Sequence, residues 1–80
     1  MRTPRNISGK ELASRLSSLG YQSVRQRGSH LRLQTMQKGE HSVTIPLHDP
    51  IPIGTLKSIL REVATHFDST TEEILVKLGY

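Results

Sequence analysis

The stretch Arg25-Gln26-Arg27-Gly28-Ser29-His30-Leu31-Arg32-Leu33 predicts two short strands joined by a two-residue turn. Gly28 followed by Ser29 is typical of a type II′ hairpin turn, because the first turn residue must adopt a positive φ. The pairs that this register predicts are Arg27 with His30, Gln26 with Leu31, Arg25 with Arg32, and Val24 with Leu33.

Strand side chains alternate between the two faces of a sheet, so this hairpin has an apolar face and a basic face. The apolar face carries Val24, Leu31 and Leu33, and the basic face carries Arg25, Arg27, His30 and Arg32. Two arginines directly opposite each other repel and destabilise a strand pair. We therefore expect an anion to bind there, phosphate first, with the histidine as a proton carrier beside it.

Length and composition limit the classes of protein to which this chain can belong. Eighty residues form one domain at most, and the absence of cysteine excludes disulfides and a thiolate nucleophile. No apolar run is long enough for a membrane span or a signal peptide, so we expect a cytoplasmic protein with no membrane partner. The net charge of +4 and pI near 10.0 fit a polyanion or an acidic protein as partner, and equally fit a role in solubility alone.

The remaining elements follow from capping and periodicity. Ser8 and Glu11 form a capping box that starts a helix over residues 9–19, which Gly20 ends. Strands are expected over 21–27, 30–35 and 41–46, with a turn at 37–40. A second helix begins near Pro52, and a second capping box, Ser69 with Glu72, opens a third, short helix.

This order predicts an α+β fold, a two-layer sandwich of helix, three-stranded antiparallel sheet and helix, with an extra short C-terminal helix. We expect a flexible N-terminal tail at 1–7 and a single domain over 8–80. The residues expected to be most buried are Leu16, Leu33, Ile45 and Leu60. The polar sheet face, which also carries Ser42 and Thr44, is expected to face solvent.

Four segments of the chain resemble a known family. They are Ser8-Gly9-Lys10-Glu11-Leu12, the stretch from Gly20-Tyr21 through Val24-Arg25-Gln26-Arg27-Gly28-Ser29-His30, Val43-Thr44-Ile45-Pro46-Leu47-His48, and Ile53-Gly54-Thr55-Leu56-Lys57-Ser58-Ile59-Leu60-Arg61. In this order they resemble the HicA (YcfA-like) family of messenger-RNA interferase toxins. The resemblance implies a fold like a double-stranded-RNA-binding domain, messenger RNA as substrate, a HicB-type antitoxin as partner, and His30 as the catalytic residue. The chain departs from the family at its C-terminus, where the predicted link at 64–69 is longer than the resemblance implies.

The residues themselves suggest a mechanism for such an enzyme. RNA is cleaved when its 2′-hydroxyl attacks the adjacent phosphorus, so a protein must remove that proton and stabilise charge on the phosphate. His30 is the candidate general base, and Arg25, Arg27 and Arg32 are the candidate phosphate ligands. Such chemistry needs no metal in principle, and we expect no cofactor. The histidine spacings match no common zinc pattern.

Several assignments stay open at this stage. His48 is a general acid or a second phosphate ligand, or only a loop histidine. Ser29 and Lys10 are candidate RNA contacts, although an exposed lysine usually binds nothing specific. His41 and His66 lack a motif and are predicted to be surface residues, and Tyr21 is expected to pack at the sheet edge. The alternatives to a ribonuclease are a non-catalytic RNA-binding module that uses the same basic face and a degenerate toxin kept for complex formation.

Overall fold

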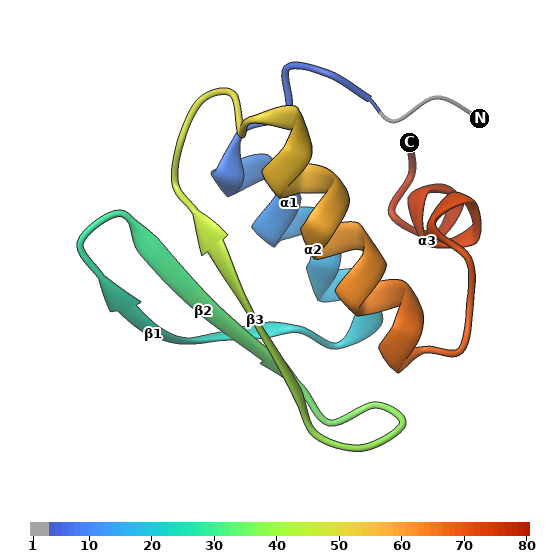
Figure 1. The fold of residues 1–80 in the computed structure, drawn as a ribbon. Helices are drawn as coiled ribbons and strands as arrows, with labels where there is room; N and C mark the ends of the chain where they lie inside the picture. The colour runs from blue at the N-terminus through green and yellow to red at the C-terminus, as the bar shows by residue number, and fades with distance from the viewer. Residues whose placement is uncertain (1–3) are drawn as a thin grey trace.

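A computed structural model describes residues 4–80 of the chain. The elements are α1 (Gly9–Leu16), a 3₁₀ turn (Ser17–Leu19), β1 (Gln22–Arg27), β2 (His30–Thr35), β3 (His41–Pro46), α2 (Ile53–His66) and α3 (Thr71–Lys77). The three strands form one antiparallel sheet in the order β1-β2-β3, and Figure 1 shows α1 and α2 on one side of it. The predicted α+β sandwich is confirmed.

The hairpin pairs as predicted close to its turn and differs further along β1. Arg27 lies opposite His30 and Arg25 opposite Arg32, and Gly28 has a φ of 59°. A β-bulge then shifts the register, so that Ser23 and not Val24 lies opposite Leu33. The prediction that Val24 joins the apolar face is wrong, since its side chain is 52% exposed.

Tyr21 gives a physical reason for this bulge. Without the extra residue, alternation would bury Val24 and turn Tyr21 toward solvent, whereas with it Ser23 and Tyr21 share the helix-facing side. The tyrosine is 1% exposed. An aromatic ring buries far more apolar surface than a valine, so the exchange stabilises the fold.

The core lies between the sheet and the helices, where strand and helix residues interleave. The four side chains predicted to be most buried, Leu16, Leu33, Ile45 and Leu60, are all at most 2% exposed. Ile7, which the sequence assigns to the N-terminal tail, is 3% exposed, and its carbonyl accepts a hydrogen bond from the Ile51 amide. The ordered core therefore includes the last residue of that segment, while residues 1–3 lie outside the described part of the chain.

The helix ends differ from the expectation in detail. The first helix tightens into the 3₁₀ turn before Gly20, whose φ of 85° ends it as predicted. The second runs to His66, which makes the following link shorter than the sequence indicates. The third is capped by Thr70 with Glu73, one residue later than the predicted pair. The Ser69 amide already donates to the Ala64 carbonyl at the end of α2, so the new helix begins after it.

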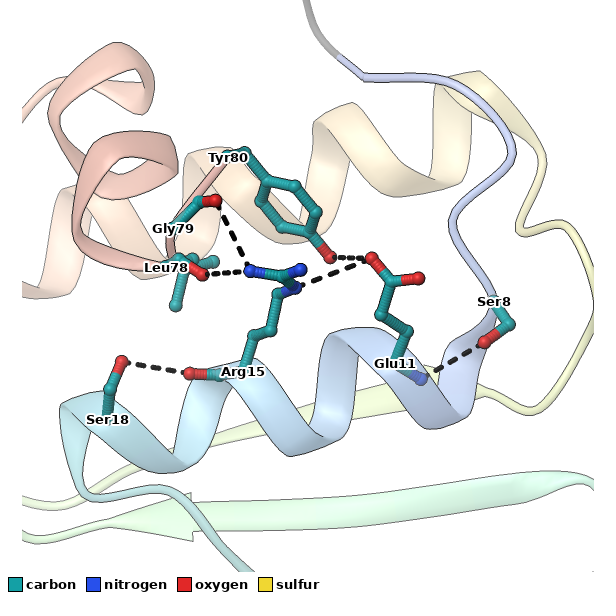
Figure 2. A network of polar contacts seen from close by, with 7 residues as sticks. All are labelled: Ser8, Glu11, Arg15, Ser18, Leu78, Gly79 and Tyr80. Carbon is teal, nitrogen blue, oxygen red and sulfur yellow. Dashed lines mark hydrogen bonds and ion pairs between the residues drawn. The ribbon is translucent and has the colours of Figure 1, made fainter.

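A polar clasp joins the C-terminus to the outer side of α1 (Figure 2). The Arg15 guanidinium donates to the carbonyls of Leu78 and Gly79 at 2.9 and 3.3 Å, and its carbon lies 4.3 Å from the Tyr80 ring centroid. The Tyr80 hydroxyl donates to the Glu11 carboxylate at 2.8 Å, and burial, with that carboxylate beside it, raises the pKa of the phenol. The Glu11 and Arg15 side chains of α1, which also form an ion pair with each other, thus connect α1 to the residues that follow α3.

Candidate functional site

The basic face of the hairpin forms a shallow hollow on the side of the sheet away from the helices. Its volume is about 200 Å³, and its lining residues are Arg25, Arg27, His30, Arg32 and Thr44. The strand register brings them together, because Arg25 pairs with Arg32, Arg27 with His30, and Arg32 with Thr44. Three guanidinium groups, one imidazole and one hydroxyl therefore meet on one surface.

The charge of this hollow is of one sign. No acidic side chain is among its lining residues in the described range 4–80. All five side chains are exposed, so water and a large ligand can reach them. Unbalanced like charges across a strand pair destabilise it by roughly 0.2–1 kcal/mol, and a bound anion removes that penalty. Guanidinium groups bind phosphate oxygens, and an imidazole is the side chain that most often transfers protons, so these residue types suit phosphate chemistry.

Backbone contacts bring the other predicted residues to the same end of the sheet. The Ser29 carbonyl accepts from the Leu47 amide at 2.7 Å, which joins the hairpin turn to the end of β3. The His48 carbonyl accepts from the Gly9 amide at 2.9 Å, which places the start of α1 and therefore Lys10 there as well. Neither Lys10 nor His48 lines the hollow, although both side chains are exposed.

Gly9 permits this close approach of helix and strand. A Cβ atom at this position would collide with the carbonyl oxygen of Pro46 and lie 2.9 Å from the Leu47 Cα. Any larger residue would push α1 away from the strand end opposite His30. The glycine in the opening segment of the chain therefore sets the spacing at this end of the sheet.

A second group of titratable side chains lies at the opposite end of β3, and the sequence did not reveal it. The rings of His41 and His66 are stacked, with centroids 4.5 Å apart and planes 11° from parallel. The Tyr21 hydroxyl hydrogen-bonds to His41 Nδ1 at 2.7 Å, and His66 Nε2 donates to the Gln37 carbonyl at 2.8 Å. Both histidines are half-buried, so the prediction that they are plain surface residues is wrong.

This packing changes the proton affinities of the group. Burial, and secondarily the charge of Glu62, raises the pKa of Tyr21 to about 12. Burial, followed by the proximity of His66, lowers the pKa of His41 from its ordinary value, and Glu62 partly opposes this. No cluster of three or more histidine, cysteine, aspartate or glutamate side chains suited to a metal ion occurs within residues 4–80.

Acidification is expected to destabilise the protein through His41. Its pKa is lower in the folded state than the ordinary 6.5, so the unfolded state binds more protons as the pH falls through that value. The contribution of neutral His41 is complete above this pH and is lost as the pH falls toward the folded-state pKa. Melting temperatures measured from pH 8 to pH 5 should fall more for the native protein than for His41→Gln. Parallel curves for the two proteins would contradict this.

Taken together, the fold and the hollow define a small basic α+β domain with one histidine among arginines on an open sheet face. The model of the family described as the HicA toxin of bacterial toxin-antitoxin matches residues 9–64, more than half of the chain. The chain belongs to this HicA toxin family, as the resemblance implied, and is a toxin of a toxin–antitoxin system. No curated protein and no solved structure matches it. In the described part of the chain, every helix is too short or too polar to cross a membrane.

Proposed function

We propose that the protein is an endoribonuclease that cleaves messenger RNA, with His30 as general base. The observation that carries this proposal is the hollow that His30 lines together with three arginines and Thr44. Phosphate binding alone needs only lysine or arginine, so an imidazole on the same surface points to proton transfer. Membership of a toxin family adds a biological reason for cutting RNA.

The proposed reaction is an intramolecular transfer within the RNA. The imidazole of His30 takes the proton of a 2′-hydroxyl, and that oxygen attacks the adjacent phosphorus. A bond forms between the 2′-oxygen and phosphorus while the bond to the 5′-oxygen breaks, and the departing oxygen takes a proton from water or from His48. The products are a 2′,3′-cyclic phosphate and a 5′-hydroxyl.

The arginines supply binding and charge stabilisation in this scheme. Guanidinium groups bind phosphate oxygens through paired, charge-assisted hydrogen bonds. Arg25 and Arg32 are direct cross-strand neighbours, so a single phosphate reaches both. Negative charge that builds up on the phosphate during attack is then offset by donors already in place. Ser29 and Lys10, at the same end of the sheet, are proposed as contacts to the neighbouring RNA backbone.

The protein partner is proposed to be a HicB-type antitoxin acting in the cytosol. Since the hollow holds several positive charges and no carboxylate in the described residues, an inhibitor that covers it is expected to present acidic or hydrogen-bonding groups. Such a complex blocks His30 and neutralises the repulsion between Arg25 and Arg32 at the same time.

Cleavage of a purified messenger RNA, followed by analysis of the product ends, tests this proposal directly. We expect fragments that carry a 2′,3′-cyclic phosphate and a 5′-hydroxyl, because the 2′-oxygen is the nucleophile. The same RNA with a 2′-deoxy substitution at the cut site should stay intact there. Fragments with 5′-phosphate ends would mean that water is the nucleophile, and the role given to His30 would be wrong.

The second candidate is an RNA-binding module without catalysis. The same exposed basic face favours it, because arginine side chains bind backbone phosphates without any chemical step. One substitution, His30→Ala, distinguishes the enzyme from the binding module. A binding module loses its function with Arg32→Ala and is nearly unaffected by His30→Ala, whereas the enzyme fails with either.

A further inference from the structure

The outer edge of β3 carries free backbone groups, and the strand register shows which ones. The hydrogen bond from the Leu47 amide to the Ser29 carbonyl fixes the alternation of the β2–β3 ladder. In an antiparallel pair, residues alternate between bonding their partner strand and pointing away from it. Val43 and Ile45 therefore direct their N–H and C=O groups to β2, while Ser42 and Thr44 direct theirs outward.

The free edge of β3 ends at Pro46. By the same alternation the backbone of Pro46 also points away from β2, and a proline has no N–H group to donate there. Its carbonyl oxygen lies against Gly9 at the start of α1, which covers that position. The backbone groups that point outward from the edge are thus those of Ser42 and Thr44, two donors and two acceptors in a row.

The other edge of the sheet is less suited to pairing. The bulge at Val24 interrupts the regular spacing of β1, which is a common way of blunting an edge strand. Between the bulge and the turn, only Gln26 directs its backbone groups outward, since Arg25 and Arg27 bond to β2. A regular outward pair exists on β3 alone among the described strands.

Figure 1 shows α2 beside β3 on the helical side of the sheet. A hollow lies between α2 and His41, the first residue of β3. Its volume is about 510 Å³, and its lining residues are His41, Ser58, Arg61, Glu62, Thr65 and His66. The helix contributes a strip of exposed side chains at positions 58, 61, 62 and 65. An edge strand with a helix alongside is the arrangement by which several domains bind an extended peptide as an added strand.

We propose that an extended acidic segment of a protein partner binds here, adding a strand to the outer edge of β3 and laying its side chains against α2. The proposal rests on the toxin assignment only in that such proteins act with a protein partner. The antitoxin that covers His30 and the segment that pairs with β3 belong to the same partner in this scheme. The two contacts adjoin at Thr44, whose side chain lines the hollow of His30 and whose backbone groups point outward from β3.

The charged side chains around the hollow beside α2 favour an acidic segment over a second copy of the chain. Arg61 lines the hollow, and Lys57 lines a neighbouring hollow together with Arg61, against one carboxylate, that of Glu62, among the described lining residues. A second copy would bring the same basic groups and a net charge of +4 to the contact. An acidic strand meets complementary charge instead.

Titration of the ¹⁵N-labelled protein with a seven-residue synthetic peptide that alternates valine and glutamate tests the proposal. The amides of Ser42 and Thr44 should shift and become protected from hydrogen exchange, while that of Gln26 should not. Ser42→Pro removes one outward N–H without touching the ladder to β2, so affinity should fall about tenfold. Gln26→Pro makes the same change on the opposite edge and should leave affinity within about twofold.

A charge variant keeps the test independent of how well Ser42→Pro folds. Arg61→Gln should weaken the peptide about two- to fivefold, as expected for an exposed ion pair. Native affinity in both Ser42→Pro and Arg61→Gln would overturn the proposal, as would shifts confined to the hairpin arginines. A concentration-dependent dimer that Ser42→Pro abolishes would assign the edge to a second copy. RNA cleavage by Ser42→Pro should stay at the native rate, so the outcome is separate from that of the ribonuclease proposal.

Discussion

His30→Ala is expected to lower the rate of RNA cleavage by about 10²–10⁴-fold, the range that general base catalysis usually contributes. Growth arrest on expression should disappear with it. His30 is exposed at the start of β2, so its truncation opens no core cavity, and stability should change by no more than about half a kcal/mol. Rates measured on folded protein at saturating RNA, with a thermal melt beside them, give the comparison.

Arg32→Ala is the matched control for this change. Both residues lie on the same strand and the same sheet face, and both line the hollow. Loss of the arginine removes a phosphate contact, so RNA affinity should fall and the slope of affinity against salt should become shallower by about one charge. His30→Ala should leave affinity and salt slope nearly unchanged. If His30→Ala cuts RNA at the native rate, base catalysis at this position is wrong and His48 becomes the next residue to test.

The hairpin could be predicted from the sequence because local rules decide it. A glycine in the first turn position and strict alternation after it were enough to place Arg27 opposite His30 and to gather the basic side chains on one face. These relations extend over fewer than ten residues.

The register of β1 beyond Arg25 could not be predicted by the same rules. Alternation placed Val24 inside, but the competing burial of Tyr21 lies in the packing of the whole core and not in the strand itself. The stacked pair of His41 and His66 is another case, since 24 positions separate them and only the path of α2 across β3 brings them together. A signal was available in Tyr21, whose hydroxyl needs a partner once the ring is buried.

The third helix shows a related limit. Two overlapping capping boxes, starting at Ser69 and Thr70, were both present in the sequence, and the choice depended on how α2 ends. The clasp of Arg15 on the C-terminal carbonyls joins residues more than sixty positions apart. No local pattern indicates such a contact, because the sequence around an arginine on α1 is the same whether or not its side chain has a distant partner.

Ile74→Ala is expected to destabilise the domain by about 2–5 kcal/mol, the usual cost of truncating a fully buried isoleucine. The helix that carries it lies outside residues 9–64, the part of the chain that matches the family, yet Ile74 is 0% exposed within the common core. A domain of this size has only about 5–15 kcal/mol of stability in total, so much of it would be lost. The free energy of unfolding from urea titration measures the effect.

Val76→Ala, on the same helix, provides the control. Its side chain is 60% exposed, so its truncation should change the free energy of unfolding by no more than about half a kcal/mol. The two substitutions alter helix propensity in the same direction by similar amounts, since both replace a β-branched residue with alanine. The difference between them therefore reports burial alone. Equal unfolding free energies for the two variants would mean that α3 does not contribute to the cooperative core, and that the domain folds as residues 7–67 without it.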